Sequence, residues 1–401
     1  MTIEDREQSS KENEIEQNSE LIKKTVDQCF GQITDFRRLN SIKYKLVDII
    51  FITLCAVLCG ADDLDAVAVY AQEKKGWLKS FLNLENVPSY TTFWWAFVLL
   101  KPEELECCFI QWVQSVIALK TGRHISVDGK ALRGTSNPNK PNSFVHMVSA
   151  WASNSNFTLG QVKVDGKSNE ITAIPKLLDM IDIEGAVVTI DAMGCQTAIA
   201  EKIIDNGGHY VLALKENQPG LYDEIVNYFN QVEDDDLENA ACKVFEANNE
   251  LEKENHGRVE ERKVYATSAI DFLLEKNKWK NLRSIACVDS KRIVKGHTSR
   301  EKRYYISCLP PDPERLGNLI RSHWGIENKV HWILDVAFQE DQLKAKTGHI
   351  AENLAVIRHM ALNLLKRDKS GKASIVKKRF KAALNESYLT ELLNGLLGSE
   401  G

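Results

Sequence analysis

The stretch Ala186–Gln196, AVVTIDAMGCQ, decides the fold. Its apolar and β-branched run Val187–Ile190 leads straight into Asp191 and is followed by the helical pattern TAIAEKIIDNGG. A continuous apolar run joined in this way to a helix is typical of a buried parallel strand. Asp191 is therefore expected at the carboxyl end of a central strand, where open α/β sheets bind ligands. Because a buried carboxylate is costly without a partner, something should pair with it.

A second strand-like run, His124–Asp128, also ends on an aspartate. Two aspartates at the ends of two core strands suggest a shared metal ion. The surrounding pattern adds two more strands, then a helix, the strand before Asp191, a second helix and a last strand. These elements are expected at 143–153, 157–164, 170–182, 186–191, 197–206 and 209–215. Three antiparallel strands followed by helix, strand, helix and strand is the order of the ribonuclease H-like fold, which is an α/β mixed sheet.

The rest of the chain divides by composition and periodicity. Residues 1–20 are acidic, lack aromatic residues and are predicted to be a disordered tail. Residues 21–120 carry helical patterns and predict a small all-helical domain, which either binds DNA or mediates dimerisation. Residues 121–401 form the predicted catalytic domain. Alternating runs predict a β-rich insertion within it, at about 216–310.

No part of the sequence predicts export or membrane insertion. The first twenty residues lack the apolar core of a signal peptide, and the longest apolar stretch, Ile49–Ala61, is too short to span a bilayer. The 9 cysteines include no metal-type Cys-x2-Cys pairs. Reduced thiols are therefore favoured over a disulfide framework or a zinc site. We expect a cytoplasmic protein, associated with the nucleoid when it is bound to DNA, that does not act at a membrane.

The formal net charge of −5 hides an uneven distribution. Residues 1–20 hold seven acids and two bases, so the remainder of the chain is neutral overall. Bases outnumber acids by thirteen to six over 256–303 and by eleven to two over 342–384. Basic surfaces on a neutral body are typical of proteins that bind polyanions. Runs of charge are more often solvated helix faces, so this pattern alone decides nothing.

A third acid, Glu327, lies inside the long helical pattern ERLGNLIRSHWGIENKVHWILDVAF, which starts near Glu314. Tryptophans stand three residues before it and five residues after it. A carboxylate among such neighbours needs a partner. Glu340 and Asp341 are rival acids, but they follow the helical pattern instead of lying within it.

We interpret Asp128, Asp191 and Glu327 as a catalytic, metal-binding triad. Phosphodiester cleavage passes through a highly negative transition state, which two Mg²⁺ ions roughly 3.5–4 Å apart can stabilise. Mg²⁺ prefers oxygen ligands and keeps several waters, so a few carboxylates suffice. The expected cofactor is Mg²⁺, for which Mn²⁺ can substitute.

Six motifs together resemble the DDE transposases of bacterial insertion sequences, in the branch of the H-repeat-associated proteins. They are VDGKALRG, DGKSNEITAIP, TIDAMGCQ, ALKENQ, HGRVEER and RSHWGIENKVHWILDVAFQED. The resemblance runs from about residue 28 to the C-terminus. It implies a ribonuclease H-like catalytic domain with a β-rich insertion before the glutamate, a preceding helical domain, and the same triad.

The sequence departs from many related transposases around the glutamate. Those carry Tyr-x2-Arg-x3-Glu-x6-Lys, whereas this chain has Ile320, His323 and Leu334 at the other three positions. Arg321, His323, Asn328 and His331 are candidates to replace the missing partners, although Arg321 and His331 could simply pair on the helix surface. His124 and His146 are interpreted as structural.

Several cations are candidate contacts to phosphate or DNA, and for each the simple alternative is a solvated side chain. They are Lys130, Arg133, Lys215, Arg258, Arg321, His323 and His331. Lys130 and Lys215 are favoured because both lie at the strand edge expected to face the metal ions.

These expectations describe a transposase that binds the terminal inverted repeats of its element, cuts the 3′ ends and joins them to target DNA. Holding two ends together implies a homodimer or a larger assembly. Three alternatives stay open: an inactive DNA-binding relic, a ribonuclease H-like nuclease without strand transfer, and a glycosidase with paired carboxylates. The glycosidase is disfavoured by the intervening lysines and by the strand-end position of the acids.

Overall fold

The computed structural model describes residues 18–117, 122–136, 144–164, 169–232, 241–248, 258–294 and 297–397, and the statements below refer to these. The predicted tail, residues 1–20, lies outside them except for 18–20, which begin a helix that runs to residue 30. In the described part of the chain, no helix has the length and apolar character needed to cross a membrane. All nine cysteines are free thiols, as the sequence predicts.

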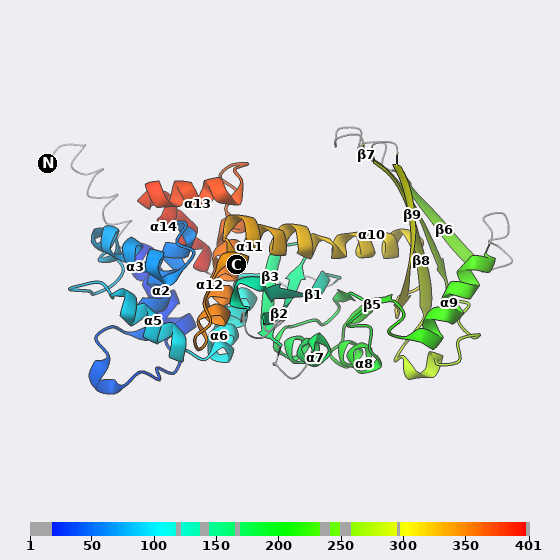
Figure 1. Ribbon diagram of the computed structural model, residues 1–401, viewed down its shortest axis with the longest axis horizontal. Coiled ribbons are helices and arrows are strands. Elements are labelled where there is room, and N and C mark those ends of the chain that lie inside the picture. The colour runs from blue at the N-terminus through cyan, green and yellow to red at the C-terminus, as the bar shows by residue number, and fades with distance from the viewer. Residues whose placement is uncertain are drawn as a thin grey trace.

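A single nine-stranded sheet runs through the centre of the molecule, in the order β3-β2-β1-β4-β5-β9-β8-β7-β6 (Figure 1). The five core strands are β1 (His124–Leu132), β2 (Val145–Ala152), β3 (Phe157–Lys163), β4 (Val187–Ile190) and β5 (His209–Leu214). Strands β1, β2 and β3 pair antiparallel, whereas β1, β4 and β5 pair parallel. The predicted fold class, a ribonuclease H-like mixed sheet, is therefore confirmed.

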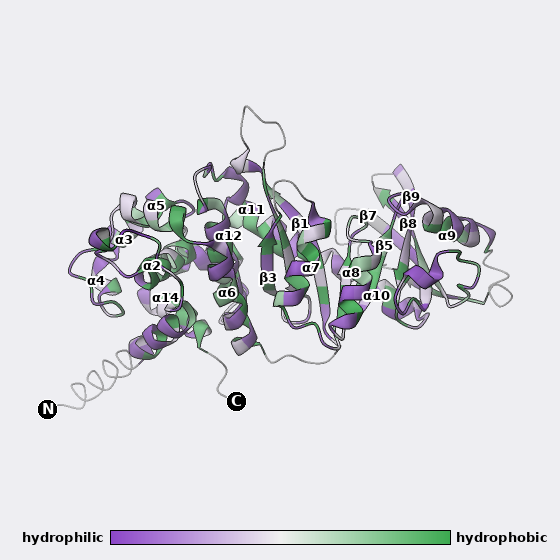
Figure 2. Ribbon diagram, turned by 90° about the horizontal axis from the view of Figure 1, so that it is seen from below, coloured by the Kyte–Doolittle hydropathy of each residue, from purple (hydrophilic) through white to green (hydrophobic). Residues whose placement is uncertain are grey.

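Helices cover both faces of the core strands. On one face, α10 (Pro313–His323) contacts β1, β4 and β5, and α11 (Trp332–Ala337) follows it. On the other face, α7 (Glu170–Met180) contacts β2 and β3, and α8 (Thr197–Asp205) contacts β5. Figure 1 shows α10 above the sheet and α7 and α8 below it, and Figure 2, seen from below, shows α7 and α8 on the near side. The apolar run of β4 is buried between these two layers, as a central parallel strand requires.

The helical body combines both ends of the described chain. Its N-terminal helices are α2 (Leu46–Leu58), α3 (Leu64–Glu73), α4 (Lys75–Leu78), α5 (Tyr90–Leu99) and α6 (Pro102–Val116). Its C-terminal helices are α12 (Ile350–Arg367), α13 (Ile375–Leu384) and α14 (Glu386–Leu393). Helix α12 contacts α2, α5, α6 and β3, so it joins this body to the sheet (Figure 1). Helix α12 belongs to the predicted catalytic domain but packs on helices of the predicted N-terminal domain. The predicted domain boundaries therefore remain a prediction.

The predicted insertion extends the core sheet. It contains β6 (Cys242–Asn248), β7 (Arg258–Thr267), β8 (Ser284–Val294) and β9 (His297–Ser307), and β9 pairs antiparallel with β5. Its first element, α9 (Pro219–Gln231), was not expected from the sequence. Leu221, Ile225 and Phe229 recur at helical spacing and are buried, a pattern that the acidic segment after it obscured.

One strand boundary differs from the prediction. Asp128 does not end its strand, because β1 continues to Leu132 and stays paired with β2 up to the Leu132–Val145 pair. Its pairing with β4 ends at Val127 and Ile190, immediately before the two aspartates. Asp128 therefore lies beside the point where the neighbouring strand β4 stops.

Candidate metal centre

Asp128 and Asp191 occupy equivalent positions on neighbouring parallel strands. Val127 of β1 pairs with Ile190 of β4, and the residue that follows each of them is an aspartate. Adjacent strands lie about 4.8 Å apart. Because side chains alternate between the faces of a strand, Asp128 points to the same face as Ser126, which is paired with Thr189. That face is the one covered by α10, and Asp191 directly follows the neighbouring strand β4.

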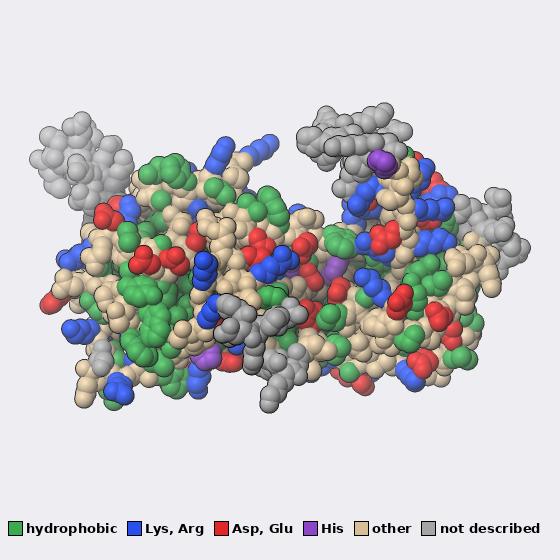
Figure 3. All heavy atoms as spheres, viewed as in Figure 1, with side chains coloured by type: hydrophobic (Ala, Val, Ile, Leu, Met, Phe, Trp, Pro, Cys, Tyr) green, Lys and Arg blue, Asp and Glu red, His purple; other side chains and the backbone are tan. Residues whose placement is uncertain are grey.

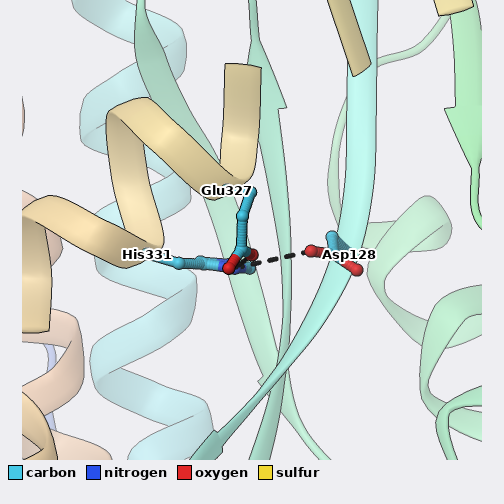
Figure 4. A group of neighbouring side chains, drawn as sticks. All are labelled: Asp128, Glu327 and His331. Atoms are coloured by element: carbon cyan, nitrogen blue, oxygen red, sulfur yellow. Dashed lines mark hydrogen bonds and ion pairs between the residues drawn. The ribbon is translucent and has the colours of Figure 1, made fainter. Parts of the chain in front are cut away.

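Glu327 reaches this edge from the helix layer. The predicted long helix is interrupted: α10 ends at His323, and Glu327–His331 form a π-helical turn before α11. π-turns widen a helix and occur frequently at functional sites. The turn places Glu327 and His331 on one side, where His331 Nδ1 lies 3.1 Å from Glu327 Oε2 and 3.4 Å from Asp128 Oδ2 (Figure 4).

Gly325 lets this segment approach the sheet. A Cβ atom built on Gly325 would lie 2.6 Å from two ring carbons of Trp151 on β2, which is too close for any non-bonded pair. Trp151 is fully buried. The glycine therefore sets how closely the residues before the π-turn pack on the strands, and with it the position of Glu327 above Asp128.

Potential ligand atoms of Asp128, Glu327 and His331 all lie within 4.8 Å of one another. This donor set fits a divalent cation: two carboxylates suit Mg²⁺ or Mn²⁺, and an imidazole nitrogen extends the choice toward Mn²⁺. His331 is buried, and its Nε2 has no hydrogen-bond partner among the described residues. Its Nδ1 is the nitrogen that faces the two acids, as Figure 4 shows.

Asp191 lies outside this compact group but lines the same cavity as Asp128 and Glu327. The cavity has a volume of about 790 Å³. Its wall also includes Met193, Lys215, Tyr222, Lys302, Arg303, Tyr304, His323 and Trp324. Figure 3 shows the surface hollowed between the helical body and the insertion, with acidic and histidine side chains in the hollow and Lys and Arg on the insertion.

The acids at the site repel one another. Burial is the main cause that raises the pKa of Asp128 to about 6; His331 opposes this rise, whereas Asp191 and Glu327 add to it. The hydrogen bond with His331 is the main cause that lowers the pKa of Glu327. A cation placed among these carboxylates would relieve the repulsion, as charge pairing generally does.

A fourth acid, Glu170, lies at the site and was missed in the sequence. It is the first residue of α7, after the N-cap Asn169. Burial, followed by the charges of Asp191 and Asp128, raises the pKa of Glu170 to about 7. In the sequence, Ser168-Asn-Glu reads as an ordinary helix start, and the only further signal is the presence of this glutamate in the motif DGKSNEITAIP.

Lys130 does not face the cavity as predicted. Its ammonium group lies 2.5 Å from Asp335 Oδ1 and 2.7 Å from Glu340 Oε2, and only 10% of its side chain is exposed. Glu340, a rival acid in the sequence, is buried and also approaches Arg358 at 3.8 Å. Burial opposes the charge on Lys130, but these carboxylates raise its pKa. Lys130 is thus engaged in ion pairs with Asp335 and Glu340 on the α11 side of the site.

His323 lines the cavity as a neutral side chain. Burial is the main cause that lowers its pKa to about 4, although Asp191 opposes the change. Its Nδ1 lies 2.9 Å from the hydroxyl of Thr189, which lies 2.8 Å from His124 Nε2. His124 has a pKa lowered to about 3, chiefly by burial. Both histidines therefore hold β4 to its neighbours, and the structural role predicted for His124 is supported by these bonds.

The other predicted cations take varied positions. Lys215 is exposed on the rim of the cavity. Arg133 is 79% exposed, with its Nε 3.8 Å from Asp341. Arg321 is exposed on α10. Arg258 begins β7, but its side chain lies outside what the structure describes. An unpredicted cation, Arg303, lies over the ring of Trp324 at 4.8 Å.

Comparison with known proteins finds two family models and several curated relatives that match this chain. The family model described as "Transposase DDE domain" matches residues 119–364, and the one described as "DDE_Tnp_1-associated" matches residues 28–113. The chain is 37% identical to "Putative transposase YncI" of Escherichia coli O157:H7, over 90% of this chain and 92% of that protein. It is 35% identical to "H repeat-associated putative transposase YhhI" of Escherichia coli K12, over 90% of this chain and 96% of that protein.

A solved structure of the piggyBac transposase in a synaptic complex with hairpin DNA matches 95% of this chain and 84% of that chain, with a TM-score of 0.42 and 12% identity. That likeness is too weak to carry an argument. The family matches span most of the chain, and the relatives are covered almost end to end. The chain therefore belongs to the DDE transposase family, in the branch of the H repeat-associated proteins.

Proposed function

We propose that this protein binds the terminal inverted repeats of its own insertion sequence, cleaves the DNA at the 3′ ends and joins them to target DNA. Both steps are in-line displacements at phosphorus, so one site can perform both. The proposed cofactor is Mg²⁺, for which Mn²⁺ can substitute. When bound, a pair of such ions activates the attacking oxygen and stabilises the leaving oxygen.

The convergence of Asp128 and Glu327 carries this proposal. These acids come from positions far apart in the chain, yet their carboxylates and His331 lie within one ion's reach. Asp191 lines the same cavity from the adjacent strand. We assign the three acids to holding the cations. His331 orients Glu327 and Asp128 through its Nδ1.

Basic side chains on the rim of the cavity suit a DNA backbone. Lys215, Lys302 and Arg303 line it, and Figure 3 shows further cations on the insertion beside the hollow. Contacts with phosphate position a duplex without reading its sequence. Because two element ends must be processed together, we propose that the protein works as a homodimer or larger assembly on DNA in the bacterial cytoplasm. The helical body would read the ends or join the subunits.

The test uses DNA that flanks the gene and carries the presumed element ends, incubated with purified protein and Mg²⁺. Wild-type protein is compared with Asp191→Asn and with Asp341→Asn, which removes a rival acid. We expect cutting at the ends and joined products from the wild type and Asp341→Asn, and a loss of both activities by a factor of about 10² or more in Asp191→Asn. Gel assays of nicked and joined DNA measure this.

The other outcomes separate the alternatives. Cutting that persists in Asp191→Asn would rule out the proposed triad. Metal-dependent cutting without joined products would favour a nuclease. Binding to the ends without cutting by the wild type would favour a relic of a transposase.

A further inference from the structure

Glu170 lies beside Gly129, on the opposite face of the sheet to Glu327. Residues 127 and 129 of β1 point away from α10, because side chains alternate along a strand and Asp128 points toward it. Helix α7 covers that second face through its contacts with β2 and β3. Its first residue, Glu170, therefore approaches Asp128 from below, whereas Glu327 approaches from above.

Gly129 makes this approach possible. A Cβ atom built on Gly129 would lie 2.1 Å from Glu170 Oε1 and 2.8 Å from Oε2. The carboxylate thus occupies the space that any other side chain at position 129 would fill. Gly129 does not need a left-handed backbone, since its φ is not among the positive values. The close packing of the Glu170 carboxylate explains why residue 129, next to Asp128, is a glycine.

Acidic side chains gather beside Gly129, where the Glu170 carboxylate packs. Besides burial, the like charges of Asp191 and Asp128 raise the pKa of Glu170, and His331 opposes them. An acid at a helix N-terminus gains only a small stabilisation from the helix dipole. That gain is small beside the repulsion of two neighbouring acids in a partly buried place. A bound cation would turn this repulsion into attraction.

We propose that Glu170 is a fourth acidic metal ligand, which would hold one divalent cation together with Asp191 and Asp128, while Asp128 and Glu327 would hold the other. This inference rests on the proposed function, because it assigns a ligand to the cations invoked there. Glu170 lies on the side of β1 that α7 covers and Glu327 on the side that α10 covers, so carboxylates from both layers border Asp128. Cations held there would stabilise the charge on the attacking and leaving oxygens.

The test measures Mn²⁺ binding to the full chain without DNA. Isothermal titration calorimetry gives the affinity, and the electron paramagnetic resonance signal of free Mn²⁺ falls as the ion binds. Glu170→Gln keeps the shape of the side chain and removes its charge. Glu103→Gln is the matched control, since Glu103 is an exposed acid in the first turn of α6. We expect Mn²⁺ affinity to fall about tenfold or more in Glu170→Gln and to be unchanged in Glu103→Gln.

A second measurement separates a ligand from a merely structural residue. With EDTA present, Glu170→Gln should melt at a higher temperature than the wild type, because it removes the repulsion between carboxylates. When Mn²⁺ is added instead, the melting temperature of Glu170→Gln should rise less than that of the wild type. A structural glutamate would instead lower the melting temperature when replaced. Gly129→Ala keeps all four acids but displaces the Glu170 carboxylate, so it should also weaken Mn²⁺ binding.

The outcomes distinguish this inference from the function on which it rests. If the wild type binds Mn²⁺ and both Glu170→Gln and Gly129→Ala bind it equally well, Glu170 is not a ligand, and the triad stands without it. If the wild type binds no Mn²⁺, the proposed metal centre itself fails. It fails equally if Asp128→Asn and Asp191→Asn bind Mn²⁺ as tightly as the wild type does.

Discussion

His323 and Lys215 line the same cavity but carry different charges at neutral pH. The sequence suggests both as cations for phosphate. Burial lowers the pKa of His323 to about 4, and its Nδ1 is bonded to Thr189, so it is neutral at pH 7. Lys215 is exposed on the rim. Only a side chain that carries its charge before binding releases counterions from DNA.

The salt dependence of DNA binding should therefore separate these two residues. In Lys215→Gln, the slope of log affinity against log salt concentration should fall by about one, because one phosphate contact is lost. In His323→Asn, whose amide can still bond to Thr189, the slope at pH 7.5 should stay unchanged. Fluorescence anisotropy with a labelled duplex at several salt concentrations measures both. A reduced slope in His323→Asn would contradict the neutral histidine.

At the scale of elements, the junction between α10 and α11 positions the glutamate of the triad. A regular helix would continue through residues 324–331, but the chain forms the π-turn Glu327–His331 instead. The preceding Gly325 packs on the ring of Trp151. The junction thus packs closely on β2 at Gly325, and Glu327 lies two residues beyond this contact.

Gly325→Ala should lower the free energy of unfolding by about 1–3 kcal/mol, because the added methyl group overlaps a rigid buried ring. It should also weaken Mn²⁺ binding, since Glu327 moves with the helix. Urea unfolding and Mn²⁺ titration check the two effects.

The controls use another glycine and a compensating change. Gly220→Ala, in α9, adds a methyl group with no atom within 4 Å, so it should leave stability unchanged or raise it. Trp151→Phe removes the ring atoms that overlap, so it should recover part of the loss when combined with Gly325→Ala. Equal destabilisation by the two glycine variants would refute the proposed contact.

At the scale of the whole molecule, a buried acid joins the helical body to the sheet. Glu106 of α6 accepts a hydrogen bond of 2.7 Å from the backbone nitrogen of Gln161 on β3. Burial raises the pKa of Glu106 from 4.5 to about 8, although the hydrogen bonds with Gln161 oppose the rise. The folded protein therefore keeps a proton on this group that the unfolded chain loses.

Stability should decline with rising pH because of Glu106. The contribution of protonated Glu106 to the free energy of unfolding is fully present below pH 4.5, which is the pKa of this group in the unfolded chain. It is lost as the pH rises to about 8, the pKa in the folded protein. Within this window the loss amounts to at most about 1.4 kcal/mol for each pH unit. Urea unfolding in EDTA between pH 5 and 9 should show a smaller decline for Glu106→Gln than for the wild type. Identical declines would show that Glu106 does not titrate in this range.

Exposed acids on the same helix provide the comparison. Glu103→Gln, also on α6, should follow the wild-type pH dependence, because Glu103 is exposed. Asp128 and Glu170 have pKa values raised in the same direction, so they add to the decline in all three proteins and cancel from the comparison.

Much of the core could be predicted from local pattern. The apolar run before Asp191, the alternation of the first three strands and the helix signals between them specify a mixed sheet, because burial of apolar side chains drives each element. Charge gave less guidance. Lys130 and Glu340 looked like a phosphate ligand and a rival acid, but they form a buried ion pair. Ion pairs between positions about 200 residues apart leave no trace in local periodicity.

The sequence by itself determined the order of the core elements along the chain, the family and the aspartates that follow two core strand segments, since these depend on short-range patterns and on shared motifs. Only the tertiary structure decided which side chains meet there. It widened the helix into a π-turn at Glu327, turned His331 toward Asp128, and placed Glu170 over Gly129. Those contacts depend on how layers pack across the sheet, and packing distances of a few ångströms are not encoded in any single stretch of the chain.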